Sequence, residues 1–213
     1  MRLYRRFILI AFLAVCALHS YAQGVAPQVR AFEPEVQVSG VTPHASVVIF
    51  GITLSDGRTL AEAAEIVQDT DGDGKVTFRP AYVLPRRGIW AAIDLESGAW
   101  SIGGREGYEI RRSSFPRDMT KKNAEGLITG LEQERAEMTV LIARPGKGAW
   151  ITGGSEGASS DADGQRNGKL LLNIDHAVPV GNSSGNAPKN LKRGDVVVAI
   201  DTFRFEVFAS AVE

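Results

Sequence analysis

Short runs of apolar residues, separated by turns rich in glycine, proline and aspartate, recur along most of the chain. Val36 and Val38 alternate with polar residues, as in a strand with one buried face. Residues 46–50 are apolar after the serine, which predicts a strand buried on both faces. Further runs lie at residues 75–78, 88–94, 99–102, 108–110, 138–143, 149–152, 169–174, 196–201 and 204–209. This spacing predicts an all-β sandwich rather than alternating strands and helices.

One segment in the first half has an ambiguous pattern. Residues 59–67 mix alanine and glutamate, which favour helical turns, with apolar residues, and they come shortly before an acidic turn. The pattern therefore allows either a strand or a short helix in this segment. We expect irregular structure that enters a strand at residues 65–68.

Between the halves the pattern changes to that of a helix. Thr120 can cap the start of residues 120–138, and Leu127 and Leu131 fall on one helical face. Gly126 and Gly130 each cost about 1 kcal/mol relative to alanine, so this helix should be short and dependent on packing.

The first 22 residues have the pattern of a secretory signal peptide. Three early arginines precede the apolar residues 7–18, and small residues near Ala22 suit a leader peptidase. The apolar run is shorter than the roughly 20 residues that a membrane span needs. We therefore expect export to the periplasm or the extracellular space, with cleavage near Ala22 and no membrane span in the mature chain. Lipidation at Cys16 is the alternative, although the bulky residue before it suits that signal poorly.

The remaining chain divides into four segments. Residues 23–34 predict an extended lead-in, residues 35–112 a first β-sandwich unit, residues 113–137 a linker with the short helix, and residues 138–213 a second β-sandwich unit. The two units either form separate small domains or combine into one pseudo-symmetric sandwich.

The two units share a sequence pattern, which suggests an internal repeat. When Val48 is set against Val140, Asp71 falls against Asp163, and residues 84–94 then match residues 191–201 after insertions. Chance is the alternative, because turns and strands favour these residue types anyway.

Residues 45–49, 69–78 and 84–90 carry a resemblance to known modules. Their order of apolar strand, Asp-Gly turn, aromatic strand and Leu-Pro turn resembles bacterial immunoglobulin-like and carboxypeptidase-regulatory-like β-sandwich modules. A tyrosine usually follows the glycine of the Leu-Pro turn, whereas this chain has Ile89 and Trp90. The resemblance implies an immunoglobulin-like sandwich that serves as a non-catalytic spacer or binding domain, and such a fold alone fixes neither role.

Composition and charge narrow the classes of partner. The only cysteine is Cys16, so the mature chain has no internal disulfide and depends on packing. Loss of the leader removes three arginines and no acid, which takes the net charge from −1 to −4. A mildly acidic chain without a basic cluster argues against nucleic acid as a partner.

The acidic turn of the first unit is a candidate metal site. Asp69, Asp71 and Asp73 have the spacing of the first half of a calcium loop, in which alternate carboxylates converge on the ion. Pro80 stands where the bidentate glutamate should be, so the alternative is a β-turn whose aspartates bond the local backbone. Residues 161–167 form a sparser second acidic turn. Calcium is the one possible cofactor.

Two serine motifs and three tryptophans complete the candidates. Ser155 and Ser183 match a nucleophile-elbow pattern, but no helical pattern follows either, and His176 is the only histidine between or after them. The tryptophans at positions 90, 100 and 150 are candidates for a sugar-stacking platform if exposed, and for the core if buried.

These observations favour one function over its alternatives. We expect an exported, non-enzymatic β-sandwich protein with a structural, adhesive or interaction role and an unknown protein or glycan partner. The alternative is a calcium- or carbohydrate-binding module that uses the acidic turns or exposed tryptophans. A serine hydrolase is the third and weakest reading.

Overall fold

The computed structural model of the chain describes residues 26–55, 58–81, 88–104, 125–128, 138–152, 158–159, 170–173, 177–183, 187–201 and 207–212. Every strand pair within these ranges is antiparallel, and the same ranges contain no helix. The all-β prediction is therefore confirmed. No helix that is long and apolar enough for a membrane crossing occurs in the part of the chain that the structure describes.

Fifteen strands follow one another along the described part of the chain. They are β1 (Gln28–Phe32), β2 (Glu35–Ser39), β3 (Ser46–Ser55), β4 (Arg58–Gln68), β5 (Lys75–Phe78), β6 (Gly88–Asp94), β7 (Trp100–Gly104), β8 (Glu125–Ile128), β9 (Met138–Arg144), β10 (Gly148–Thr152), β11 (Ala158–Ser159), β12 (Leu170–Asn173), β13 (Val178–Pro179), β14 (Val196–Asp201) and β15 (Val207–Ala211).

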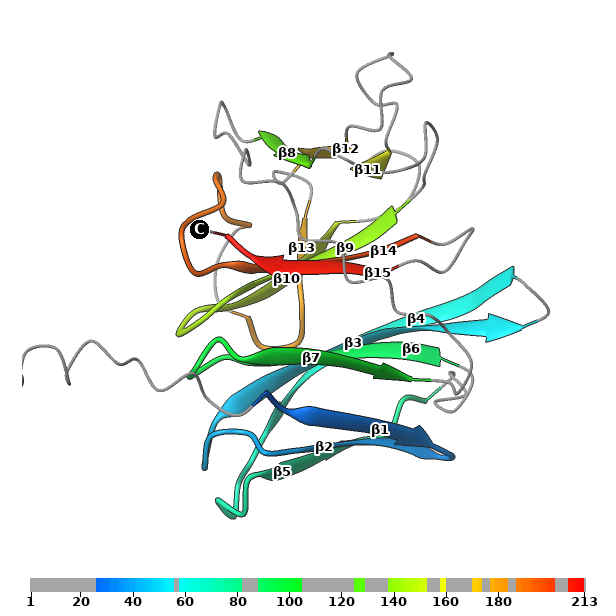
Figure 1. The fold of residues 1–213 in the computed structure, drawn as a ribbon, viewed down its shortest axis with the longest axis vertical. Helices are drawn as coiled ribbons and strands as arrows, with labels where there is room; N and C mark the ends of the chain where they lie inside the picture. Colours follow the sequence, from blue (N-terminus) through cyan, green and yellow to red (C-terminus); the bar gives the residue numbers. More distant parts are fainter. Residues whose placement is uncertain are drawn as a thin grey trace, which may run out of the picture.

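The strands form four sheets that stack in layers. From bottom to top in Figure 1 the sheets are β1-β2-β5, β4-β3-β6-β7, β13-β10-β9-β14-β15 and β11-β12-β8. The two sheets with more strands face each other in the middle of the stack. Each half of the chain therefore contributes one large sheet and one three-stranded sheet.

Strand β3 shows why the large sheet of the first half is buried on both faces. Val48, Phe50 and Ile52 pack against the large sheet of the second half, whereas Val47 and Ile49 pack towards sheet β1-β2-β5. All five side chains are fully buried. A strand covered on both faces is a continuous apolar run, so the sequence prediction for residues 46–50 is confirmed.

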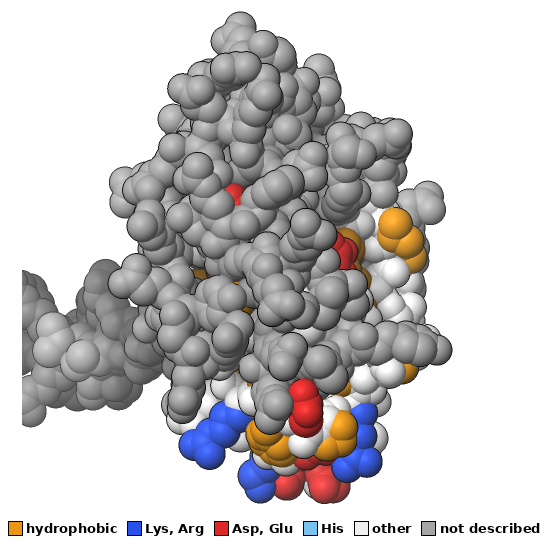
Figure 2. All heavy atoms as spheres, turned by 90° about the vertical axis from the view of Figure 1, so that its right-hand side faces the viewer, with side chains coloured by type: hydrophobic (Ala, Val, Ile, Leu, Met, Phe, Trp, Pro, Cys, Tyr) orange, Lys and Arg blue, Asp and Glu red, His pale blue; other side chains and the backbone are white. Residues whose placement is uncertain are grey.

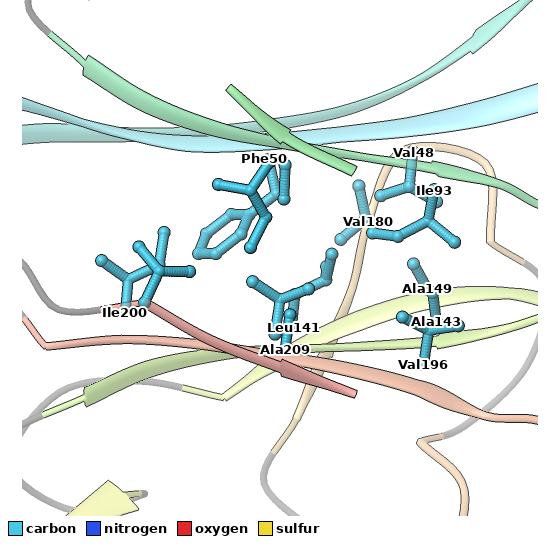
Figure 3. Packing of buried hydrophobic residues seen from close by; sticks show 14 of the residues in the cluster. Val48, Phe50, Ile93, Leu141, Ala143, Ala149, Val180, Val196, Ile200 and Ala209 are labelled. Atoms are coloured by element: carbon cyan, nitrogen blue, oxygen red, sulfur yellow. The ribbon is translucent and has the colours of Figure 1, made fainter. Parts of the chain in front are cut away.

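The largest core lies between the two large sheets and joins the halves. Figure 3 shows Phe50 from the first half pointing towards Leu141 and Ile200 from the second half. A backbone hydrogen bond from Gly146 N–H to the carbonyl of Leu95 (2.8 Å) also links the halves. The packing resembles that of two sheets in a sandwich, with inner faces interdigitating.

The irregular structure predicted at residues 59–64 is wrong, whereas the strand predicted at residues 65–68 is confirmed. Residues Arg58–Gln68 form strand β4, which pairs with β3 along its length, with one register shift at Thr53/Leu54. The backbone partners that β3 supplies outweigh the helical preference of alanine and glutamate.

The joining helix predicted within residues 120–138 is wrong over Glu125–Ile128. These residues form β8, which pairs with β12. This segment is short and contains Gly126, which disfavours a helix, so pairing with a strand distant in sequence decides its structure. Residues 113–124 and 129–137 lie outside the described ranges.

The lead-in predicted for residues 23–34 contains strand β1 in place of an unpaired tether, and β1 pairs with β2 from Gln28 opposite Ser39 to Phe32 opposite Glu35. Some predictions fall outside the described residues. These are the leader with Cys16, the strand at residues 108–110, the second acidic turn at residues 161–167, Ser155 and His176.

Four strands of each large sheet have the same order, but the sequence alignment has the wrong register between β3 and β9. Strands β4-β3-β6-β7 correspond in order and connection to β10-β9-β14-β15. Val48 packs into the core between the halves, so its counterpart on β9 should point into the same core. Leu141 and Ala143 of β9 do so, whereas Val140 does not. A slip of one residue exchanges the two faces of a strand, so Val48 cannot match Val140.

Candidate functional site

The acidic turn between β4 and β5 is organised by one buried carboxylate. Asp69 is 1% exposed. Its Oδ1 accepts a hydrogen bond from Gly72 N–H (3.0 Å), and its Oδ2 accepts from Gly74 N–H (3.0 Å) and His44 N–H (3.1 Å). Asp69 thus closes its own turn and ties it to the loop before β3.

These hydrogen bonds also set the ionisation of Asp69. Burial by itself raises the pKa of a carboxyl, but hydrogen bonds with the backbone N–H groups of Gly74 and His44, the Asp71 side chain and the backbone N–H of Gly72 outweigh burial and hold the pKa of Asp69 below its ordinary value. Asp69 is therefore a carboxylate at neutral pH.

Asp71 and Asp73 are exposed and make local bonds. Asp71 Oδ1 accepts from Asp73 N–H at 3.3 Å, and Asp73 Oδ1 accepts from Lys75 N–H at 2.8 Å. The Lys75 ammonium also lies 3.1 Å from Asp73 Oδ2. The β-turn interpretation, in which the aspartates bond the local backbone, is confirmed for this turn.

The same three carboxylates lie close enough to share a cation. One oxygen from each of Asp69, Asp71 and Asp73 lies within 4.8 Å of the others. Two ligands of one calcium ion, each 2.3–2.6 Å from it, are separated by up to about 5 Å. Calcium needs six to eight oxygens, and after Asp73 the chain enters strand β5 rather than a helix. The turn therefore supplies part of a coordination shell.

His44 packs against this turn through an unusual backbone conformation. It is the one residue other than glycine with a positive φ among the described residues, at 62°. A Cβ on Gly72 would lie 2.5 Å from His44 Cε1, so the imidazole lies directly over that glycine. Only glycine leaves room for the ring here, and the turn and loop are packed as one unit.

Ser183 lies at a cavity of about 390 Å³ between turns of the two halves, together with His44, Glu96 and Lys147. Its Oγ accepts a hydrogen bond from Ala149 N–H at 2.9 Å. Within the described residues no imidazole or carboxylate is bonded to this hydroxyl. Ser183 thus helps to fix the start of β10, and the arrangement around it is not that of an activated nucleophile.

The tryptophans do not form an exposed platform. Trp90 is fully buried and Trp150 is 3% exposed, while Trp100 is half-buried against the core between the halves. Trp90 packs edge-on against Phe78, with ring centroids 6.0 Å apart. The exposed-tryptophan alternative for sugar binding is therefore wrong for Trp90 and Trp150, because aromatic area of this size packs in the core.

Two further aspartates hold turns. Asp94, at the end of β6, accepts from the N–H groups of Thr42 (2.7 Å), Glu96 and Ser97. Asp195 is 1% exposed and makes two 2.8 Å bonds with Arg144. The Gly-Asp pair before β14 signals a turn, but nothing local to Asp195 points to an arginine on β9.

No protein-family model, curated protein or solved structure matches this chain. The resemblance to immunoglobulin-like modules stays a prediction, and the candidate sites depend on their geometry alone.

Proposed function

We propose that this protein is exported and acts by binding, as a non-enzymatic β-sandwich protein with a structural, adhesive or interaction role. The observation that carries the proposal is the use of the buried carboxylates Asp69, Asp94 and Asp195. Each accepts backbone N–H groups that close turns, so these candidates for chemistry support the scaffold. Scaffolds of this kind commonly present a surface to a partner.

An immunoglobulin-like identity and an internal duplication are part of this proposal. The matching order of β4-β3-β6-β7 and β10-β9-β14-β15 supports a duplication. The two three-stranded sheets, which cover the outer side of each large sheet in Figure 1, support two sandwich units. Both units would then present their surfaces on a common rigid core.

The partner is a protein or a glycan rather than nucleic acid. At the lower end of the view in Figure 2, where sheet β1-β2-β5 lies, basic, acidic and hydrophobic side chains lie side by side. Arg79 is paired there with Glu35 at 2.9 Å, and Lys75 with Asp73. Paired charges of both signs do not create the positive field that attracts phosphates.

Fractionation of the native cells tests export and binding together. We expect the chain without its first 22 residues in the periplasmic or extracellular fraction, cross-linked there to a specific partner. Uncleaved chain in the cytoplasm would contradict the proposal of export. Turnover of a substrate by the purified protein would contradict the absence of a reaction centre.

Calcium binding at Asp69, Asp71 and Asp73 is the second candidate, favoured by the proximity of their oxygens. Weak extracellular sites bind in the range of about 0.1–1 mM. If calcium binds there, about 10 mM calcium raises the melting temperature of the mature protein relative to chelator. Asp71→Ala should abolish this rise, because it removes one of the three ligands. The variant should still fold, because Asp71 accepts a backbone hydrogen bond from Asp73 within the same turn. Glu96→Gln should retain the rise. An equal rise in Asp71→Ala would exclude this site.

A further inference from the structure

The two large sheets leave a groove on one side of the molecule, between their edge strands β4 and β13. The groove has a volume of about 460 Å³. We call it the edge groove. Glu62, Ala64, Ile151, Val178, Pro179 and Gly181 are among the residues that line it.

The inner part of the edge groove is apolar and incompletely covered. Val178 is 65% exposed, and among the described residues the only other exposed large hydrophobic side chain is Phe32, at 40%. It pairs with Ile151, so both side chains point to the same side of the sheet, the side of the core between the halves. Ala64 on β4 packs against this core from the opposite sheet. An apolar side chain placed between Ala64 and Val178 would extend the core outwards.

Strand β4 is an edge strand of its sheet among the described residues, and it directs backbone groups towards the same place. The bond from Asp69 N–H to the carbonyl of Ala45 and the register of β4 with β3 fix which residues face β3. Glu62, Ala64 and Ile66 consequently direct their N–H and C=O groups away from β3. Ile66 N–H is bound by Glu65 Oε1 at 3.3 Å. Among the residues that the structure describes, the outward groups of Glu62 and Ala64 bond no other backbone group, and a further strand can pair with them.

The opposite edge cannot compete for such a strand. Pro179 of β13 pairs with Trp150 in a position where its nitrogen would face outwards, and proline has no N–H to donate. Proline on an edge strand is a known means of preventing strand addition. Strand β4 is therefore the edge of the groove that can be extended.

The charges of the edge groove indicate what kind of segment fits. Glu62 and Glu65 are both exposed, and none of the described residues that line the groove is a lysine or an arginine. Glu62 is held in place by the hydroxyl of Thr139, which donates to its Oε1 at 2.5 Å. Glu65 pairs with Ile49, so its side chain starts on the other face of β4, and its Oε1 turns to the strand edge, where it accepts from Ile66 N–H beside Gly181. A second copy of β4 would place like charges together, which disfavours self-association through this edge.

We propose that the edge groove binds an extended segment of another protein, in which apolar and basic residues alternate, as an added strand beside β4. The inference rests on the proposed binding function and names the partner's chemistry. Because side chains of a strand alternate, its apolar residues enter the gap between Ala64 and Val178 while its basic residues lie on the side of Glu65. Hydrogen bonds with Glu62 and Ala64 supply the backbone contacts.

A synthetic octapeptide of alternating valine and lysine is the probe, titrated into the mature protein by calorimetry. We expect saturable binding, and slower hydrogen exchange at the amides of Glu62 and Ala64. Alternating valine and glutamate should bind at least about tenfold more weakly. The valine–lysine peptide with N-methyl groups on alternate amides retains its charges but loses donors, and it should also bind at least about tenfold more weakly.

Three variants test the location. Ala64→Pro removes an outward N–H without removing a bond to β3, and Val178→Asp places a charge in the apolar gap; both should abolish binding. Glu96→Gln changes an exposed acid outside the groove and should leave binding of the valine–lysine peptide unchanged. Absence of binding by the valine–lysine peptide, or equal binding of the N-methylated peptide, would overturn the inference. If cell fractionation still identifies a specific partner, the proposed function stands while the edge groove is excluded as its site.

Discussion

Asp94 ends strand β6, and its carboxylate binds N–H groups on both sides of it in the sequence. Thr42 lies 52 residues before it, and Glu96 and Ser97 follow directly. Burial by itself raises the pKa of Asp94, but bonds from the side chain and backbone of Thr42 and from Ser97 and Glu96 outweigh burial and lower it. One carboxylate thus stabilises two turns of the first half.

Asp94→Asn should lower stability in a manner that depends on pH. The lowered pKa means that the native state binds a proton more weakly than the unfolded chain, whose aspartates titrate near pH 3.9. The stabilisation is present above that pH and is lost as the pH falls through the lower native pKa. At pH 7 the variant should be less stable by about 1–3 kcal/mol, since a poorly satisfied cluster of buried donors remains.

Urea unfolding of the wild type and Asp94→Asn between pH 7 and pH 3 measures this difference. We expect the difference in free energy of unfolding between the two proteins to become smaller as the pH falls below about 4. Glu96→Gln, at an exposed position beside it, should show almost no difference. If the difference in free energy of unfolding between Asp94→Asn and the wild type stays constant across this pH range, the charge of the Asp94 carboxylate does not contribute to stability.

At the scale of strands, sequence reasoning succeeded where burial alone decides the pattern. The run at residues 46–50 identified β3 and its two buried faces, and the valines at 36 and 38 identified β2. It failed for β8 and for the part of β4 before residue 65, because their alanine, glutamate and glycine residues do not favour a strand locally. Pairing with β3 and β12 determines these strands, and the sequence of neither strand reveals its partner.

The candidate sites divide in the same way. The acidic turn could be predicted because Asp69, Asp71 and Asp73 are close in sequence and bond nearby backbone groups. The edge groove could not, since Ala64 and Val178 come from different halves and only the stacking of the sheets brings them to one place. A local pattern therefore identifies a turn, while a groove between sheets depends on the fold.

Gly51 is where β3 and β6 depend on the absence of a side chain. It pairs with Trp90, and a Cβ at Gly51 would lie 2.3 Å from Trp90 Cε3 and 2.7 Å from the carbonyl oxygen of Ile89. Gly51→Ala should therefore destabilise the protein by about 1–3 kcal/mol, because the fully buried indole has no room to move.

A double-mutant cycle separates crowding by the indole from crowding by the backbone. Trp90→Phe alone leaves a cavity, but Gly51→Ala should cost less in a Trp90→Phe background than in the wild type when unfolding is followed by circular dichroism in urea. Gly51→Ala should still be destabilising in the Trp90→Phe background, because the contact with the Ile89 carbonyl remains. Strict additivity of the two substitutions would mean that the indole is not the obstacle.

At the scale of the whole molecule, the largest core belongs to neither half alone. Phe50, Ile52 and Ile93 from the first half pack with Leu141 and Val198 from the second, and all are buried. Separating the halves would expose both apolar faces to water. Because burial of such faces dominates stability, we expect the halves to unfold together.

Differential scanning calorimetry of the mature protein should accordingly show one transition, with calorimetric and van't Hoff enthalpies equal. Phe50→Ala removes a fully buried ring from the shared core and should shift that entire transition down, by about 3–5 kcal/mol of stability. Phe32→Ala is the matched control, because the same substitution falls on a side chain that is 40% exposed, and it should shift the transition much less. Two separate transitions, with only one displaced by Phe50→Ala, would mean that each half is stable by itself. The interface in Figure 3 would then be a contact between independent domains, and the edge groove, which both halves line, would depend on their docking rather than on the fold of one cooperative unit.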